Sequence, residues 1–219
     1  MRMKRNRAMK KKGLLIVISG PSGAGKGTIC KELVKKKNFY ISVSATTRKP
    51  RNGEAEGISY YFLSKNEFMD KVRKNEFLEY ADVYGNMYGT PRKSVEEKLK
   101  QGIDVILEID IQGALKVKKT FPDGVFIFIL PPSMEELKKR IINRKSETAE
   151  SLMTRFKSAY NEINYVSEYN YAVVNDNVET AADKVISILT AEKCKVSRIE
   201  DLSSKEEFFD EKIYDQSAN

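Results

Sequence analysis

Short apolar runs alternate with amphipathic stretches along most of this chain. The runs, rich in Val, Ile and Leu, are residues 14–18, 105–109, 125–130 and 171–174. Such runs predict strands buried on both faces of a sheet. The amphipathic stretches that predict helices are residues 25–37, 112–119, 133–141 and 178–191. Strands separated by helices indicate an α/β fold, with a parallel sheet core and helices on both faces.

Two regions interrupt this alternation. Residues 42–92 are rich in Gly, Thr, Arg and Tyr, and a helix opens at Ser64 with Glu67 three positions later, so we predict an inserted small mixed α/β unit. The polar residues 143–151 separate two helical segments and predict a short helical lid. In the helix at 25–37, the periodicity places Ile29, Leu33 and Val34 on one side.

The predicted organisation follows from these interruptions and from the charged ends. It comprises a basic N-terminal arm at 1–12, expected to be disordered; a core of 13–41, 93–134 and 165–195; the insertion at 42–92; the lid at 135–164; and an acidic C-terminal tail at 196–219.

The net charge of +8 is concentrated at the ends of the chain. Residues 1–12 contain seven basic and no acidic residues, whereas residues 200–219 contain seven acidic residues against two lysines. One interpretation of the arm is that it binds nucleic acid, which is compatible with another function in the rest of the chain. Another interpretation is that it is an organellar transit peptide. The body between the ends is moderately basic.

Composition excludes several classes of protein. With no histidine, the chain has no Ser-His-Asp triad and no imidazole metal site. Its apolar runs are too short to cross a membrane. Cys30 and Cys194 lack the spacing of a metal or disulfide motif, and two isolated cysteines fit the reducing cytoplasm, where we expect the protein to reside.

The strongest motif lies between the first predicted strand and the first predicted helix. It reads Gly20, Pro21, Ser22, Gly23, Ala24, Gly25, Lys26, Gly27, Thr28. Glycines let backbone N–H groups point at phosphate oxygens, and the lysine reaches the β and γ phosphates, so the motif predicts binding of a nucleoside triphosphate. The usual Ser or Thr after the lysine is replaced by Gly27. The sequence therefore does not identify a direct protein ligand for magnesium.

A second cluster of polar residues lies in the insertion. Arg48 and Arg51, three positions apart, form a fork of donors suited to one phosphate, and Tyr60 adds a hydroxyl. An isolated carboxylate, Glu79, and two further hydroxyl side chains, Tyr88 and Thr90, follow. With the phosphate-loop motif, these residues make the sequence resemble a guanylate kinase of the nucleoside monophosphate kinase group, over residues 13–195.

The resemblance implies ATP and GMP as substrates and transfer of the γ-phosphoryl group to GMP. Glu79 matches the carboxylate that reads guanine, with Ser44 and Thr90 at the hydroxyl contacts. The acceptor phosphate is expected at Arg48, Arg51, Tyr60 and Tyr88, with Glu54 orienting the arginines. Use of dGMP is expected as well.

Glu108 and Asp110 end a predicted strand over 106–110, at the carboxyl edge where α/β sheets bind ligands. Strand alternation is expected to send both side chains to the same face. In the family this strand end faces the space between the two nucleotides, where carboxylates contact the GMP side and hold magnesium-bound water. Mg²⁺ is therefore expected with ATP, with Thr28 and Asp110 as candidates to hold it through water. For Asp110, capping of the following helix is an open alternative.

Three arginines of the lid region, Arg140, Arg144 and Arg155, are further candidates. Arg144 and Arg155 match the family's lid arginines, which act on the transferring phosphoryl group. The glycines that flank the first lid arginine in the family are replaced here by Asn143 and Lys145, on either side of Arg144. Asn175 matches a position near the adenine of ATP, with a strand-end turn as the alternative.

Two other functions compete with this one. The chain could phosphorylate another monophosphate such as AMP, or be a guanylate-kinase-like interaction module without catalysis. Such modules typically lack the working lysine that Lys26 supplies here. The sequence leaves the choice between a monomer and a homo-oligomer open.

Overall fold

Five parallel strands form the core sheet. The computed structural model describes residues 12–83, 85–142 and 149–198, with the side chains of residues 149–155 outside that description. The strand order is β2 (Tyr40–Ile41), β7 (Val105–Glu108), β1 (Leu15–Ser19), β8 (Val125–Leu130) and β9 (Tyr171–Val174). Every neighbouring pair is parallel, as predicted. The two-residue strand β2 was not predicted, because so short a run carries no periodicity.

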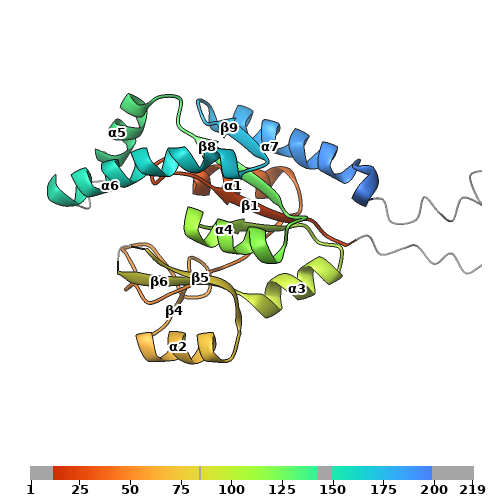
Figure 1. Cartoon of the computed structure of the whole chain (residues 1–219), viewed down its shortest axis with the longest axis horizontal. Coiled ribbons are helices and arrows are strands. Elements are labelled where there is room, and N and C mark those ends of the chain that lie inside the picture. Colours follow the sequence, from red (N-terminus) through yellow and green to blue (C-terminus); the bar gives the residue numbers. More distant parts are fainter. Residues whose placement is uncertain (1–11, 84, 143–148, 199–219) are drawn as a thin grey trace, which may run out of the picture.

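Helices cover both faces of this sheet, which also confirms the prediction (Figure 1). On one face, Ile16 and Ile18 of β1 pack with residues of α1 (Lys26–Lys36) and α7 (Val178–Lys193). On the other, Leu15 and Val17 pack with α3 (Arg92–Lys100) and α4 (Ile111–Thr120). Alternate residues of one buried strand therefore serve two separate cores.

One detail of the first helix was predicted wrongly. Val34 is 43% exposed, whereas Cys30 is buried beside Ile29 and Leu33. The apolar face of α1 is therefore rotated toward Cys30. Cys194, the other cysteine, is exposed.

A second, mixed sheet lies below the core in Figure 1. Its strand order is β4 (Tyr61–Phe62), β3 (Ala45–Thr46), β6 (Asn86–Pro91) and β5 (Phe77–Val83). Helix α2 (Lys65–Arg73) begins at Ser64 with the predicted capping box, in which Ser64 and Glu67 bond each other's backbone N–H. Phe68 of α2 stacks on Phe77 of β5 with ring centroids 4.5 Å apart, so the helix shares a small core with the sheet.

Helices α5 (Met134–Ile142) and α6 (Ala149–Ile163) lie at the upper left of Figure 1. Ala159 and Phe156 of α6 pack on Leu137 and Ile141 of α5. The Ser133 hydroxyl caps α5 by accepting from Glu136 N at 3.1 Å. Short 3₁₀ turns at Asn164–Glu168 and Val196–Arg198 follow.

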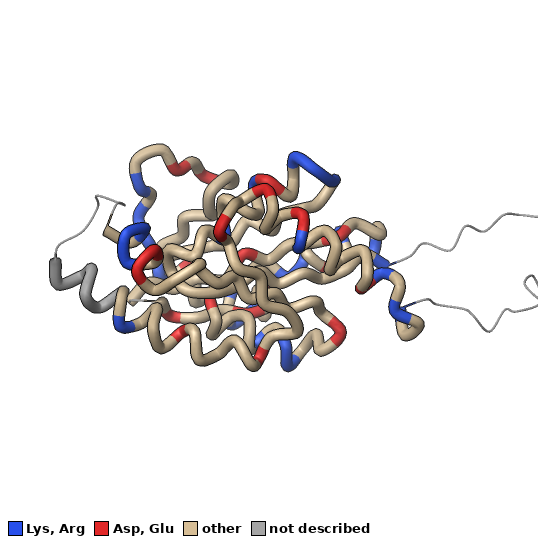
Figure 2. The backbone as a smooth tube through the Cα atoms, turned by 90° about the horizontal axis from the view of Figure 1, so that it is seen from above, with Lys and Arg blue, Asp and Glu red and all other residues tan. Residues whose placement is uncertain are grey.

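Basic and acidic positions are interspersed along the described chain rather than gathered on one element (Figure 2). Several form ion pairs, such as Lys36 with Asp183 at 2.6 Å and Lys193 with Asp104 at 2.5 Å. Residues 1–11 of the basic arm and 199–219 of the acidic tail lie outside the described residues. Among the residues that are described, no helix has the length and apolar character needed to cross a membrane.

Candidate active site

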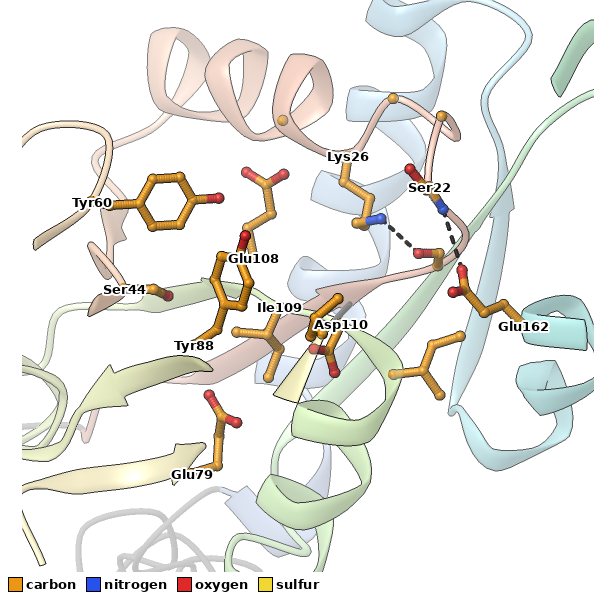
Figure 3. Close-up of a pocket in the computed structure, with 16 residues that line it drawn as sticks. Ser22, Lys26, Ser44, Tyr60, Glu79, Tyr88, Glu108, Ile109, Asp110 and Glu162 are labelled. Carbon is orange, nitrogen blue, oxygen red and sulfur yellow. Dashed lines mark hydrogen bonds between the residues drawn. The ribbon is translucent and has the colours of Figure 1, made fainter. Parts of the chain in front are cut away.

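One cavity collects most of the predicted site residues (Figure 3). It lies at the carboxyl ends of β1 and β7 and is bounded by the second sheet, by the start of α4 and by α6. The predicted residues that line it are Gly20, Ser22, Gly23, Gly25, Lys26, Gly27, Ser44, Tyr60, Glu79, Tyr88, Glu108 and Asp110. Residues more than 80 positions apart in the sequence therefore share one space.

The phosphate-loop motif forms the turn from β1 into α1. Gly23 and Gly25 have positive φ angles of 92° and 90°, which residues with a Cβ rarely adopt. A Cβ on Gly23 would lie 3.1 Å from side-chain atoms of Leu137 and Ile141, and one on Gly25 would lie 2.3 Å from the amide of Asn175. Both glycines are therefore required by the backbone and by their neighbours.

Lys26 is the first residue of α1, and its ammonium group folds back on the loop. It donates to Gly20 O at 2.6 Å and to Pro21 O at 3.1 Å. The Asn175 amide donates to Ala24 O at 2.8 Å, and Asn175 is 3% exposed. Arg140 donates in turn to Asn175 O. The structure thus brings Asn175 to the phosphate loop, with Arg140 behind it.

A carboxylate lies beside Gly27, which replaces the usual hydroxyl residue of the loop. A Cβ on Gly27 would lie 3.2 Å from Glu108 Oε1. Thr28, the next residue, is exposed and does not line the cavity. Among the described residues, no three of Asp, Glu, Cys and His cluster as a metal site. An oxygen donor for Mg²⁺ beside the loop is therefore offered by Glu108 rather than by a threonine.

Glu79 extends from β5 into the cavity and is 7% exposed. The Thr90 hydroxyl, on the neighbouring strand β6, donates to its Oε1 at 2.7 Å. Burial raises the pKa of Glu79 to about 7, against the opposing effect of the Thr90 bond. A Cβ on Gly113 of α4 would lie 2.7 Å from Glu79 Oε2, so a side chain at that place in the helix would displace the Glu79 carboxylate.

Asp110 caps helix α4, which confirms the capping role that the sequence left open for it. Its Oδ1 accepts from Gly113 N at 2.7 Å. Strand β7 ends at Glu108, so the expectation that strand alternation continues to Asp110 was wrong. Asp110 still lines the cavity, and burial raises its pKa. One side chain thus fixes the start of α4 and faces the site.

The arginine cluster lies on the second-sheet side of the cavity. Glu54 Oε1 accepts from Arg48 Nη2 at 2.8 Å, and Glu54 Oε2 accepts from the backbone N of Arg51 at 2.8 Å. Arg48 also donates to the Tyr88 hydroxyl at 3.2 Å and lies 5.4 Å from the ring centre of Tyr60. Glu54 therefore holds Arg48 by its side chain, whereas Arg51 is held at its backbone and is exposed.

The lid arginines are described only in part. Arg144 lies outside the described residues, as do Asn143 and Lys145. Arg155 lies in α6, but its side chain is outside the description. The structure therefore places the helix of one lid arginine and neither guanidinium group.

Among the residues that the sequence did not identify, Gly113 and Glu162 contact groups of the site. Gly113 carried a signal, because a glycine inside a helix costs about 1 kcal/mol relative to alanine and calls for a reason. Glu162 of α6 also lines the cavity, where its Oε2 accepts from Ser22 N at 3.3 Å. A glutamate on an amphipathic helix gives no signal of this kind in the sequence.

A phosphate loop at the carboxyl edge of a parallel sheet, facing a second unit that carries a buried carboxylate and an arginine cluster, defines a P-loop phosphotransferase that acts on a small anionic acceptor. Comparisons with known proteins agree with this class of protein. The sequence model described as guanylate kinase matches residues 12–192.

Relatives of known name agree with this match. The guanylate kinase of Clostridium acetobutylicum is 69% identical over 94% of this chain and 100% of its own, and that of Caldanaerobacter subterraneus is 59% identical over 90% and 97%. The crystal structure of guanylate kinase from Anaplasma phagocytophilum superposes with a TM-score of 0.78 at 38% identity, covering 91% of this chain and 96% of that one. The chain belongs to the guanylate kinase family, nucleoside monophosphate kinases that use ATP to phosphorylate GMP.

Proposed function

We propose that this chain carries out the guanylate kinase reaction, ATP + GMP giving ADP + GDP, with the residues of the cavity between the phosphate loop and the second sheet. The observation that supports it is the position of Glu79, a buried carboxylate bonded to Thr90 in the same cavity as Lys26. A base-reading group and a phosphate-binding group thus face one space.

Guanine is the base that suits Glu79. It presents N1–H and an exocyclic amine side by side, two parallel donors that one ionised carboxylate accepts together, whereas adenine has no such pair. Thr90 occupies Oε1 from one side, and Ser44 lies across the cavity. An incorrect base leaves the buried carboxylate unpaired, which allows discrimination of about 10⁴-fold.

The acceptor phosphate of GMP is assigned to Arg48, Arg51, Tyr60 and Tyr88. Glu54 and the Tyr88 hydroxyl hold the Arg48 guanidinium in place, so little side-chain freedom is lost when a phosphate binds. The exposed Arg51 side chain extends from the same loop and supplies the second guanidinium.

The phosphates of ATP are assigned to the loop from Gly20 to Thr28. Lys26 exchanges the carbonyls of Gly20 and Pro21 for phosphate oxygens when ATP binds. Asn175 supports the loop by donating a hydrogen bond to Ala24 O. We propose that Asn175 also lies near the adenine of bound ATP. Arg144 and Arg155 are assigned to the transferring phosphoryl group, whose charge in the transition state they neutralise.

Mg²⁺ is proposed to bind with ATP. The ion favours oxygen ligands and retains waters, so phosphate oxygens and a nearby carboxylate suffice. Glu108, beside Gly27, fits this place, and Asp110 is a candidate to hold a magnesium-bound water. When bound, the ion neutralises charge on the phosphates; Thr28, exposed outside the cavity, fits less well.

Closure of the second-sheet unit and of the lid is proposed to remove water from the reacting groups. We propose that two units move, the insertion at 42–92 and the lid at 135–164. We also expect dGMP to be a substrate, since the assigned contacts go to the base and the phosphate rather than to the ribose 2′-hydroxyl.

A coupled assay of ADP release tests this proposal with purified protein and ATP, across GMP, dGMP, AMP, UMP and CMP. We expect GMP and dGMP to be phosphorylated and the other three to be poor acceptors. Equal turnover of AMP and GMP would overturn the assignment of Glu79 as the base-reading residue.

A further inference from the structure

A carboxylate from α6 lies on the phosphate loop. Glu162 Oε2 accepts a hydrogen bond from the backbone N of Ser22 at 3.3 Å, between residues 140 positions apart in the sequence. Figure 3 shows this contact near the Lys26 ammonium group, with Glu162 pointing from α6 toward the loop.

The surroundings of Glu162 resemble those that the loop provides for a phosphate. Burial raises the pKa of this carboxyl, and the Lys26 ammonium and the Ser22 N–H oppose that rise by stabilising the charged form. A backbone N–H and this lysine are the two kinds of donor with which such a loop binds phosphate oxygens. Glu162 therefore presents an anionic oxygen where an anion is to bind.

Helix α6 is also connected to the loop through α5. Ala159 of α6 packs on Leu137 and Ile141 of α5. The same two side chains lie 3.1 Å from the place where a Cβ on Gly23 would be. The loop thus touches the α5–α6 pair at two points, an apolar one at Gly23 and a polar one at Ser22.

We propose that Glu162 mimics a phosphate: its carboxylate holds the phosphate loop of the nucleotide-free enzyme and competes with ATP for the Ser22 N–H and the Lys26 ammonium group. This inference rests on the proposed function, since it requires that the loop bind the phosphates of ATP. Glu162 is a positioning residue that acts through the loop.

The competition predicts what Glu162 does when ATP binds. When phosphate oxygens arrive, two negative groups at one set of donors repel each other, so the Glu162 side chain leaves the loop. When the products depart, Glu162 returns to Ser22 N and satisfies that donor again.

The test is calorimetric titration with ATP in the absence of GMP, on the full chain. Glu162→Gln keeps the size and an acceptor oxygen but removes the charge. We expect the dissociation constant of ATP to fall by about three- to tenfold, an effect typical of removing one nearby like charge. We expect the dissociation constant of GMP to stay unchanged.

Glu168→Gln is the matched control, because it removes the same charge from an exposed residue six positions further on. It should leave ATP binding as in the unaltered protein. An unchanged or weaker affinity for ATP in Glu162→Gln overturns the inference. If the unaltered protein itself does not bind ATP, the proposed function fails instead, so the two failures are distinguishable.

Hydrogen exchange supplies a second measurement. In the nucleotide-free protein, Glu162→Ala should speed exchange of the Ser22 amide, whereas Glu168→Ala should not. Equal exchange in both variants would show that Glu162 does not hold the loop, and a thermal melt of each variant checks that it is folded.

Discussion

The phosphate-binding half of the cavity is built from backbone, whereas the base-reading half is built from side chains. Gly20 to Thr28 are contiguous, and the turn from β1 into α1 orients their N–H groups, with Asn175 and Glu162 as supporting contacts from elsewhere in the chain. Glu79, Thr90 and Gly113 come instead from β5, β6 and α4. The first half depends on one local conformation and the second on the packing of three elements.

This difference separates two kinds of recognition. Backbone N–H groups and a lysine bind any polyphosphate, so the loop supplies affinity without distinguishing the base. A buried carboxylate whose one oxygen is already bonded to Thr90 accepts only a matching pair of donors. Changes in the first half should therefore affect turnover with every substrate, and changes in the second should affect the choice of substrate.

The largest effect is expected from Lys26→Ala. Loss of the ammonium group removes charge stabilisation from the transferring phosphates, so kcat should fall by about 10³-fold or more. The coupled assay measures it with GMP and dGMP, which should be affected alike. Lys31→Ala is the control, an exposed lysine of the same helix. A variant at Lys26 with near-normal kcat would contradict the assignment.

Glu79→Gln should follow, with a loss of about 10²- to 10³-fold in kcat/KM for GMP and a relaxed choice of base. The amide offers one acceptor in place of two. The same change should raise the free energy of unfolding at pH 8, because it removes a buried charge. Glu76→Gln, an exposed residue of the same unit, serves as the control for both measurements. Retained GMP selectivity would rule out Glu79 as the base reader.

Gly113→Ala is expected to raise the KM for GMP by about tenfold and leave the KM for ATP unchanged. The added Cβ would lie 2.7 Å from Glu79 Oε2 and would displace the carboxylate. Fold-changes of this size correspond to about 1.4 kcal/mol. Gln112→Ala, at an exposed position one residue earlier, should leave both KM values as they are. Equal changes in both KM values would indicate a general distortion of the site.

The smallest effect is expected from pH. The pKa of Glu79 in the folded protein is about 7, above its usual 4.5, so the folded state binds more protons between these values. The free energy of unfolding should therefore fall as pH rises from 4.5 to 7, by about 3 kcal/mol. Guanine requires the ionised carboxylate, so the KM for GMP should rise by about fivefold from pH 7 to pH 6, as the ionised fraction falls.

Glu79→Gln provides the control for the pH measurements. Chemical denaturation and the coupled assay should both lose this part of their pH dependence in the variant. A slope that persists in Glu79→Gln would assign it to another group.

The core sheet could be predicted because its central strands β1, β7 and β8 are buried on both faces. Strand β9 was expected to be buried in the same way, which was wrong, because it lies at the edge of the sheet and exposes Ala172 and Val174. Four of its strands appear in the sequence as continuous apolar runs, and the helices between them require parallel pairing. Strand β2 and helix α3 were not predicted, since the first has two residues and the second has buried side chains only at Val95 and Leu99. Val34 was placed wrongly because periodicity alone does not separate it from Cys30.

The residues of the candidate site also divide into those that the sequence identified and those that it did not. The loop motif is contiguous, so its place between strand and helix followed from the pattern alone. The contact of Glu54 with Arg48 spans six residues and was anticipated through the resemblance. Glu162 and Gly113 could not be assigned, because their roles depend on α6 meeting the loop and on α4 meeting β5.

By itself, the sequence determined the parallel core, the inserted unit and the phosphate loop, since each depends on periodicity or on neighbouring residues. Only the tertiary structure decided that Glu79 is buried with its pKa raised to about 7, that Asp110 caps α4 and that Glu162 lies on the loop. The physical reason is that burial and charge pairing are set by elements distant in the chain. Local pattern specifies backbone conformation, whereas the environment of a carboxylate is specified by what packs around it.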